Sequence, residues 1–145
     1  MKLFCWNCLN DLVFNNYLEY LNHNHNQNQS YIVFSSELWK TISKIEMNTI
    51  SYSIENDLNI DMKTLIIPSQ VGYFWMFYVG DVSKKVFCTF PDSSWLKNDV
   101  IHQYLCKYLS IEWELEMSNV GKHLLAYQSG YYSLFMIEEN FSKES

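Results

Sequence analysis

Apolar residues near the start of the chain recur at every third or fourth position, which is the period of one face of a helix. The segment 9–21 therefore predicts an amphipathic helix with Asn10 as its N-cap. The polar tract that follows, NHNHNQNQ, predicts a solvated loop over 22–30. The apolar positions that set the helical period are Leu9, Leu12, Val13, Tyr17 and Leu21.

The middle of the chain carries mostly β patterns. YIVF at 31–34 predicts a short strand, and SSELWKTISKI predicts a helix capped by Ser35 or Ser36. TLIIP predicts a buried strand that ends at Pro68. YFWMFYV and VFCTF, joined by the turn GDVSKK, predict an antiparallel hairpin, because both runs are rich in aromatic and β-branched residues.

The last third of the chain predicts a helix, a strand and a second helix. SSWLKNDVIHQYLCKYL is amphipathic, IEWELEM alternates as a half-buried strand does, and GYYSLFMIEENF is an apolar helix. No repeat and no linker divides the chain, so we expect one α+β domain over 1–145. The inward positions expected in the first of these helices are Leu96, Val100, Ile101, Tyr104, Leu105 and Tyr108.

Composition narrows the class of protein. Hydrophobic residues make up 48% and aromatic residues 17% of the chain, which excludes a disordered protein. The aromatic surplus has two interpretations: exposed patches that contact a protein partner, or a tyrosine-rich core whose hydroxyl groups reach the surface.

Net charge, the lengths of apolar runs and the spacing of cysteines exclude further classes of protein. With a net charge of −6 and scattered basic residues, the chain has no basic stripe for nucleic acid. It has no apolar run that could span a membrane and no signal-peptide pattern, so we expect an intracellular protein, cytoplasmic or nuclear, with reduced thiols. Cys5 and Cys8 lack a second ligand pair, and His23 and His25 lie in the polar tract, so we expect no metal and no cofactor.

Four segments, in order, resemble one enzyme family. CLNDLVFNNYLEYL resembles the W-L-N-D-x-x-I-x-x-Y opening of the Ulp/sentrin-specific cysteine peptidases, which process and deconjugate SUMO and NEDD8, although Cys8 stands where tryptophan is usual. YIVFSSELWKTIS is similar to V-x-x-F-x-T-F-F-Y-x-x-L, and LIIPSQVGYFWMFYVGDVSKKVFCTFPDS to the family's I-x-x-P-I-N-x-x-x-H-W segment and its following strand. YQSGYYSLFMIEENF is similar to the terminal D-C-G-V-F-V helix.

The resemblance covers nearly the whole chain and implies a papain-like, Ulp-type fold. Its central sheet would be mostly antiparallel and flanked by helices. It also requires the strand YFWMFYV to lie beside the N-terminus of the last helix. If it does not, the chain is instead an α+β interaction domain unrelated to peptidases.

The family's chemistry needs a thiolate, an imidazole, a carboxylate and an oxyanion-hole glutamine. The resemblance puts Phe74 at the imidazole position and Ser129 at the thiol position. Asp92 occupies the carboxylate position, and His123 lies near the place of the glutamine. Only one of the four roles is filled, so the family's reaction is expected to be absent.

Two of these residues have other interpretations. Asp92 or Ser93 is also a natural N-cap for the helix that begins near Trp95, and Ser129 could cap the last helix. Alternatively, His123 and Asp92 could activate Ser129 in a rebuilt site, which would make the protein an active hydrolase.

The hypothesis that follows is a non-catalytic pseudo-peptidase that binds proteins as a scaffold subunit of a complex. In the family, a tryptophan and neighbouring strands line a tunnel for a Gly-Gly tail. The resemblance therefore implies that Trp75, with Trp6 or Trp39, binds an extended peptide or the tail of a ubiquitin-like protein. An unrelated protein partner fits the sequence equally well.

Overall fold

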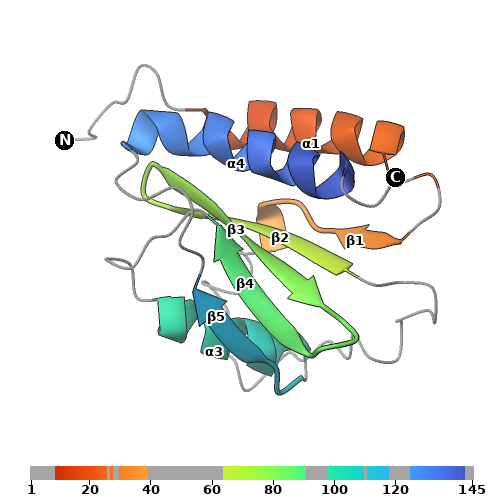
Figure 1. Ribbon diagram of the computed structural model, residues 1–145. Helices are drawn as coiled ribbons and strands as arrows, with labels where there is room; N and C mark the ends of the chain where they lie inside the picture. Colours follow the sequence, from red (N-terminus) through yellow and green to blue (C-terminus); the bar gives the residue numbers. More distant parts are fainter. Residues whose placement is uncertain are drawn as a thin grey trace.

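A five-stranded mixed β-sheet forms the middle layer of the protein (Figure 1). The computed structural model describes residues 9–25, 27, 30–38, 64–90, 98–109, 111–117 and 125–142. Helices α1 (Asp11–His25) and α4 (Ala126–Ser142) cover one face of the sheet, and α3 (Asn98–Leu109) covers the other. The strands, in spatial order, are β1 (Tyr31–Val33), β2 (Thr64–Val71), β3 (Phe74–Asp81), β4 (Val86–Phe90) and β5 (Glu114–Met117).

The pairing of the strands confirms an α+β fold with an antiparallel centre. β2, β3 and β4 pair antiparallel, and the shorter β1 and β5 add parallel strands at the two edges. The hairpin predicted from YFWMFYV and VFCTF is therefore confirmed as β3 and β4. The alternation predicted for IEWELEM is also present, since Ile111 and Trp113 are buried while Glu112 and Glu114 are exposed.

Strand β3 is buried on both of its faces. Phe74, Met76 and Tyr78 lie in the core on the α3 side. Trp75 and Phe77 lie in the core beneath α1 and α4. A strand covered on both sides needs an unbroken apolar run rather than an alternating one, which explains the sequence FWMFY.

The first helix begins as predicted, but only some of the apolar positions that predicted it face the core. The side-chain oxygen of Asn10 accepts a hydrogen bond from the Val13 N–H at 2.9 Å, as an N-cap does. The buried residues of the helix are Phe14, Leu18 and Leu21. Leu12, Val13 and Tyr17, which helped to predict the helix, are exposed instead. Both sets have helical spacing, so the pattern alone could not select the inner face.

Two boundaries in the first half of the chain differ from the prediction. Helix α1 continues to His25, so 22–25 is helical, although its residues are largely solvated as the polar tract implied. Strand β2 does not end at Pro68 but runs to Val71. Among the described residues β1 pairs with Thr64–Ile66, so Pro68 lies beyond the β1–β2 pairing, where its missing N–H breaks no hydrogen bond to β1.

Other predicted elements lie partly outside the described residues. The Leu38 N–H bonds to the Ser35 carbonyl, and the Ser35 hydroxyl accepts from the Glu37 N–H, so a helical turn begins there as predicted. The remainder of that helix lies outside the described residues, as do Ser93 and Trp95. In α3 the inward position of Leu105 is confirmed. The side chains of the other five positions expected to face inward are also outside the described part.

The turn between β3 and β4 is organised by one carboxylate. An oxygen of Asp81 accepts hydrogen bonds from the Ser83 hydroxyl at 2.7 Å, the Ser83 N–H at 3.0 Å and the Lys84 N–H at 3.1 Å. Burial by itself would raise the pKa of Asp81. The hydrogen bonds from Ser83 and Lys84, helped by the Lys84 charge, outweigh it and lower the pKa below the ordinary value.

Replacing Asp81 by alanine is expected to lower the free energy of unfolding by about 1 kcal/mol, because these hydrogen bonds are lost. Asp81→Asn is the matched control, since its amide oxygen can still accept them. The pKa is lower in the folded state, so the stabilisation by the charge is complete above the ordinary aspartate pKa of about 3.9. It is lost as the pH falls through the lowered folded value. Urea unfolding at neutral pH and at about pH 3 tests this. A difference between wild type and Asp81→Asn that stays constant at acid pH would contradict it.

Candidate functional site

The N-terminus of α4 is capped by its own first turn. The Gln128 side chain accepts a hydrogen bond from the Leu125 N–H at 3.0 Å, and the Leu125 carbonyl accepts from the N–H groups of Gln128 and Ser129. Leu125 is thus the N-cap, and Gln128 plays the part that a glutamine plays in a capping box. The prediction that Ser129 caps this helix is wrong, because Ser129 lies inside α4.

The strand YFWMFYV does lie beside the start of this helix, as the family resemblance requires. The Ser129 hydroxyl accepts a hydrogen bond from the Trp75 N–H at 2.7 Å, and both groups are buried. One turn further along α4, the Ser133 hydroxyl donates to the Trp75 carbonyl at 3.4 Å. Two serines of α4 therefore hold the main chain of β3 at Trp75.

Trp75 is also fixed by contacts on the α1 side. Its indole stacks on the Phe14 ring, with ring centroids 3.9 Å apart and 4° between the ring planes. Its Nε1–H donates to the Leu9 carbonyl at 2.8 Å. Gly130 completes the contact, because a Cβ atom at that position would lie 2.8 Å from Leu9 Cβ and 3.0 Å from Trp75 Cδ1. The indole is fully buried, so it presents no surface to a ligand in this structure.

Phe74 and Ser129, which the resemblance puts at the imidazole and thiol positions, have different surroundings. The Ser129 hydroxyl bonds to the peptide group that joins Phe74 to Trp75, so the chain is close at this point. The Phe74 side chain, however, lies in the core on the α3 side together with Leu65 and Ile67, and is 4% exposed. Its ring thus occupies an apolar environment on the opposite face of the sheet from Trp75, as expected for neighbours on a strand.

The other candidate residues lie outside the described part of the chain. Asp92, His123, Trp6 and Trp39 belong to this group, so their roles stay predictions. Within the described ranges, no cluster of three or more histidine, cysteine or acidic side chains could hold a metal ion. In the same ranges, no helix is both long and apolar enough to cross a bilayer.

Both described cysteines have a raised thiol pKa. Cys88 and Cys106 are unpaired and partly buried. Burial raises the pKa of the Cys88 thiol, and the neighbouring Glu116 raises it further. Burial likewise raises the pKa of Cys106, which lies 3.3 Å from His102 Nε2. Because the thiolate is the nucleophilic form, a raised pKa lowers the fraction of reactive thiolate at neutral pH.

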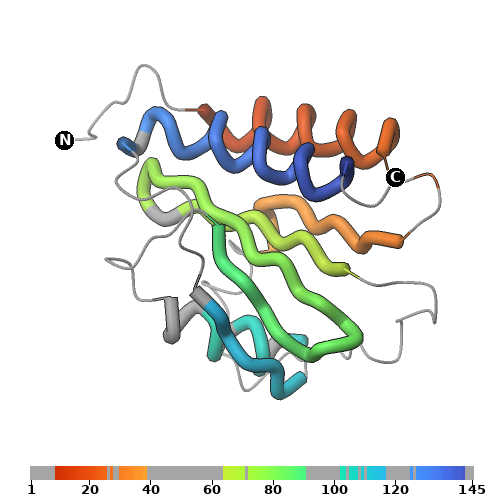
Figure 2. The backbone as a smooth tube through the Cα atoms, viewed as in Figure 1, coloured from red at the N-terminus to blue at the C-terminus, as the bar shows by residue number. Residues whose placement is uncertain are grey.

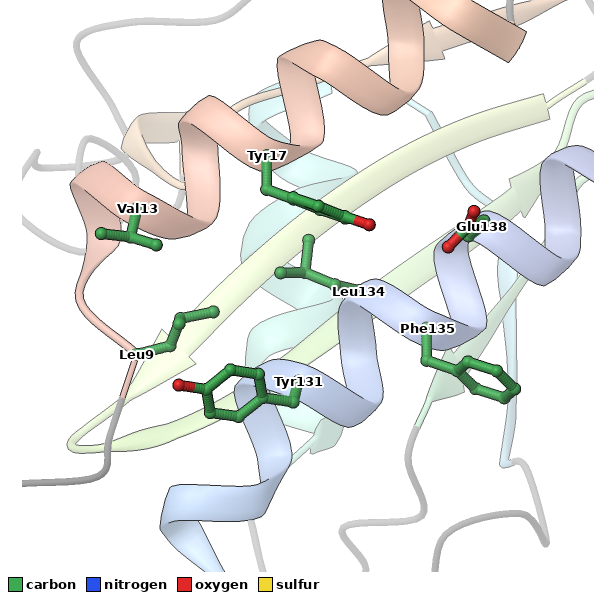
Figure 3. A pocket seen from close by; sticks show the side chains of 7 residues that line it. All are labelled: Leu9, Val13, Tyr17, Tyr131, Leu134, Phe135 and Glu138. Atoms are coloured by element: carbon green, nitrogen blue, oxygen red, sulfur yellow. The ribbon is translucent and has the colours of Figure 1, made fainter.

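A surface feature that the sequence did not locate is an apolar groove between the outer faces of α1 and α4. Its volume is about 350 Å³, and Figure 3 shows side chains from both helices around it. The signals were present in the sequence as an aromatic surplus and as the second apolar stripe of α1. The residues that line the groove are Leu9, Val13, Tyr17, Tyr131, Leu134, Phe135 and Glu138.

Comparison with known proteins gives matches through structure alone. No family model matches the chain, and no curated protein matches it by sequence. The SUMO protease Ulp1 with its catalytic cysteine oxidised to a sulfinic acid superposes with a TM-score of 0.69 at 15% identity. That match covers 94% of this chain and 67% of the other.

Two further solved structures have a similar fold. The C-terminal Ulp1 protease domain in complex with Smt3, the yeast ortholog of SUMO, has a TM-score of 0.65 at 14% identity, covering 94% of this chain and 66% of that one. The Ulp1-like SUMO protease catalytic domain of Chaetomium thermophilum has a TM-score of 0.62 at 13% identity, covering 88% and 59%. This chain spans about two thirds of the length of these structures. It has the fold of the Ulp1-type SUMO protease domains.

Proposed function

We propose that this protein is a non-catalytic pseudo-peptidase of the Ulp type that binds another protein as a scaffold subunit of a complex. The observation that carries the proposal is the Ser129 hydroxyl, which is fully buried and accepts a 2.7 Å hydrogen bond from the Trp75 N–H. A hydroxyl placed in this way stabilises the contact between α4 and β3.

A serine nucleophile needs access to the substrate and a base that takes its proton. Burial removes the access at Ser129. Phe74, which the resemblance puts at the imidazole position, has no atom that can accept a proton, and its ring is packed in the core. Nucleophile and base act as a unit, so losing both removes most of the rate enhancement of such a site.

The partner in this proposal is a protein. A ubiquitin-like protein is one candidate, because one of the structural neighbours is a Ulp1 domain in complex with Smt3. An unrelated subunit of a stable complex is the other. The proposal places this function inside the cell, in the cytoplasm or the nucleus, as the sequence suggests.

Activity-based labelling tests the loss of catalysis. We expect no covalent adduct when the purified protein is incubated with SUMO vinyl sulfone, NEDD8 vinyl sulfone or a fluorophosphonate, while an active Ulp1 domain in a parallel reaction is labelled. Intact mass spectrometry reads out the adduct. Ser129→Ala is the matched variant, and an adduct on wild type that disappears in Ser129→Ala would overturn the proposal in favour of a rebuilt hydrolase.

A further inference from the structure

We propose that the groove between α1 and α4 binds an amphipathic helix of a protein partner, one with an apolar stripe flanked by lysine or arginine. This inference rests on the protein-binding part of the proposed function and is independent of whether the reaction centre is active. Ser129 and Ser133 bond to β3 on the inner side of α4, whereas the groove lies on its outer side.

The two helices form a track of the right shape. They lie side by side and run in the same direction (Figure 2), with Gly130 close to Leu9 at one end and the His25 and Phe141 rings 6.0 Å apart at the other. The groove positions on α4 are Tyr131, Leu134, Phe135 and Glu138. This i, i+3, i+4, i+7 spacing covers about 10 Å of helix, which matches two turns of a docked helix.

The walls of the groove are apolar side chains that water reaches. Tyr131 is 59% exposed and Phe135 is 56% exposed on α4, while Val13 and Tyr17 on α1 are 48% and 43% exposed. Leu134 projects between the two helices (Figure 3) and is 7% exposed. Both helices thus present apolar side chains outward as well as inward, and an outward patch of aromatic residues marks a site of interaction.

The charge of the groove favours one kind of binding partner. Of the four acidic side chains in helices α1 and α4, Glu138 lines the groove, and neither helix contains lysine or arginine. A second copy of this chain would bring like charges together, and an anionic membrane surface would be repelled. A helix with basic residues beside its apolar stripe is complementary to this surface.

Fluorescence anisotropy with a designed peptide tests this directly. The probe is a labelled helix of about four turns, ~14 residues, with leucine at the stripe positions and lysine beside them, and the comparison peptide carries glutamate in place of lysine. We expect the lysine peptide to bind at least about tenfold more tightly than the glutamate peptide. Phe135→Glu should weaken it by about tenfold or more, and Glu138→Lys should remove the preference for lysine.

The controls separate this site from general attraction to an acidic protein. Tyr73→Ser removes an exposed aromatic ring in the β2–β3 turn, outside the groove, and should leave binding unchanged. Because Phe135 and Glu138 are not core residues, circular dichroism should show that the variants fold. Binding of the lysine peptide that Phe135→Glu leaves intact would overturn the inference. A homodimer seen in sedimentation that Phe135→Glu abolishes would also overturn the inference. Binding to phosphatidylcholine vesicles that the same substitution abolishes would overturn it too. None of these outcomes depends on the labelling at Ser129.

Discussion

Trp75→Ala should lower the free energy of unfolding by about 4 kcal/mol, because a fully buried indole is replaced by a cavity. The change removes the stacking on Phe14 and leaves the Leu9 carbonyl without its indole donor. A domain of this size is typically stable by about 5–15 kcal/mol. The substitution should therefore remove a large share of the free energy of unfolding and weaken the packing of α1 on the sheet.

Urea unfolding followed by far-ultraviolet circular dichroism measures this change. Trp75→Phe is the matched control, since it keeps an aromatic ring against Phe14 and loses the Nε1 hydrogen bond, at a cost of about 1–2 kcal/mol. Tyr73→Ala, two residues earlier and exposed, should cost little. If Trp75→Ala lowered the free energy of unfolding no more than Tyr73→Ala, the indole contacts with Phe14 and Leu9 would not stabilise the fold as described.

Gly130→Val should destabilise the protein by about 3 kcal/mol through overpacking. The first added carbon alone would lie 2.8 Å from Leu9 Cβ and 3.0 Å from Trp75 Cδ1. Neither neighbour can move easily, since Leu9 Cβ is attached directly to the backbone and Trp75 is held by α4 through its main chain. We expect a midpoint of thermal unfolding that is lower by roughly 10 °C.

The comparison for Gly130→Val is Tyr131→Val, because it places the same β-branched side chain one position later on the exposed side of α4. Differential scanning calorimetry of the two variants isolates the steric contribution. Valine has a higher helix propensity than glycine, so a loss for Gly130→Val no larger than that for Tyr131→Val would show that contact with Leu9 and Trp75 does not limit the space at this position.

Local chemistry made parts of the fold predictable from sequence. The hairpin of β3 and β4 follows from two β-rich runs around a turn, and the Asn10 cap follows from its position before an amphipathic segment. The Ulp-type architecture came instead from the order of four weak resemblances, and the solved structures confirm it. Periodicity by itself would have given elements without their arrangement.

The surroundings of the candidate site were beyond the reach of the pattern. The hydrogen bond from Trp75 to Ser129 joins positions 54 residues apart, and no spacing rule predicts it. The start of α4 was missed because Leu125 is a poor N-cap by residue type and is rescued by Gln128. The apolar positions of α1 predicted a helix but not the side that faces the core, because a helix with apolar residues on two sides has no unique inner side.

The side-by-side arrangement of α1 and α4 has a consequence for biosynthesis. A ribosome completes α1 before α4, yet each supplies part of the same core around Trp75. Until α4 emerges, Phe14, Leu18 and Leu21 are only partly covered, so the nascent chain exposes apolar surface between the synthesis of the two helices. Chaperones that shield emerging polypeptides would act on this helix during that interval.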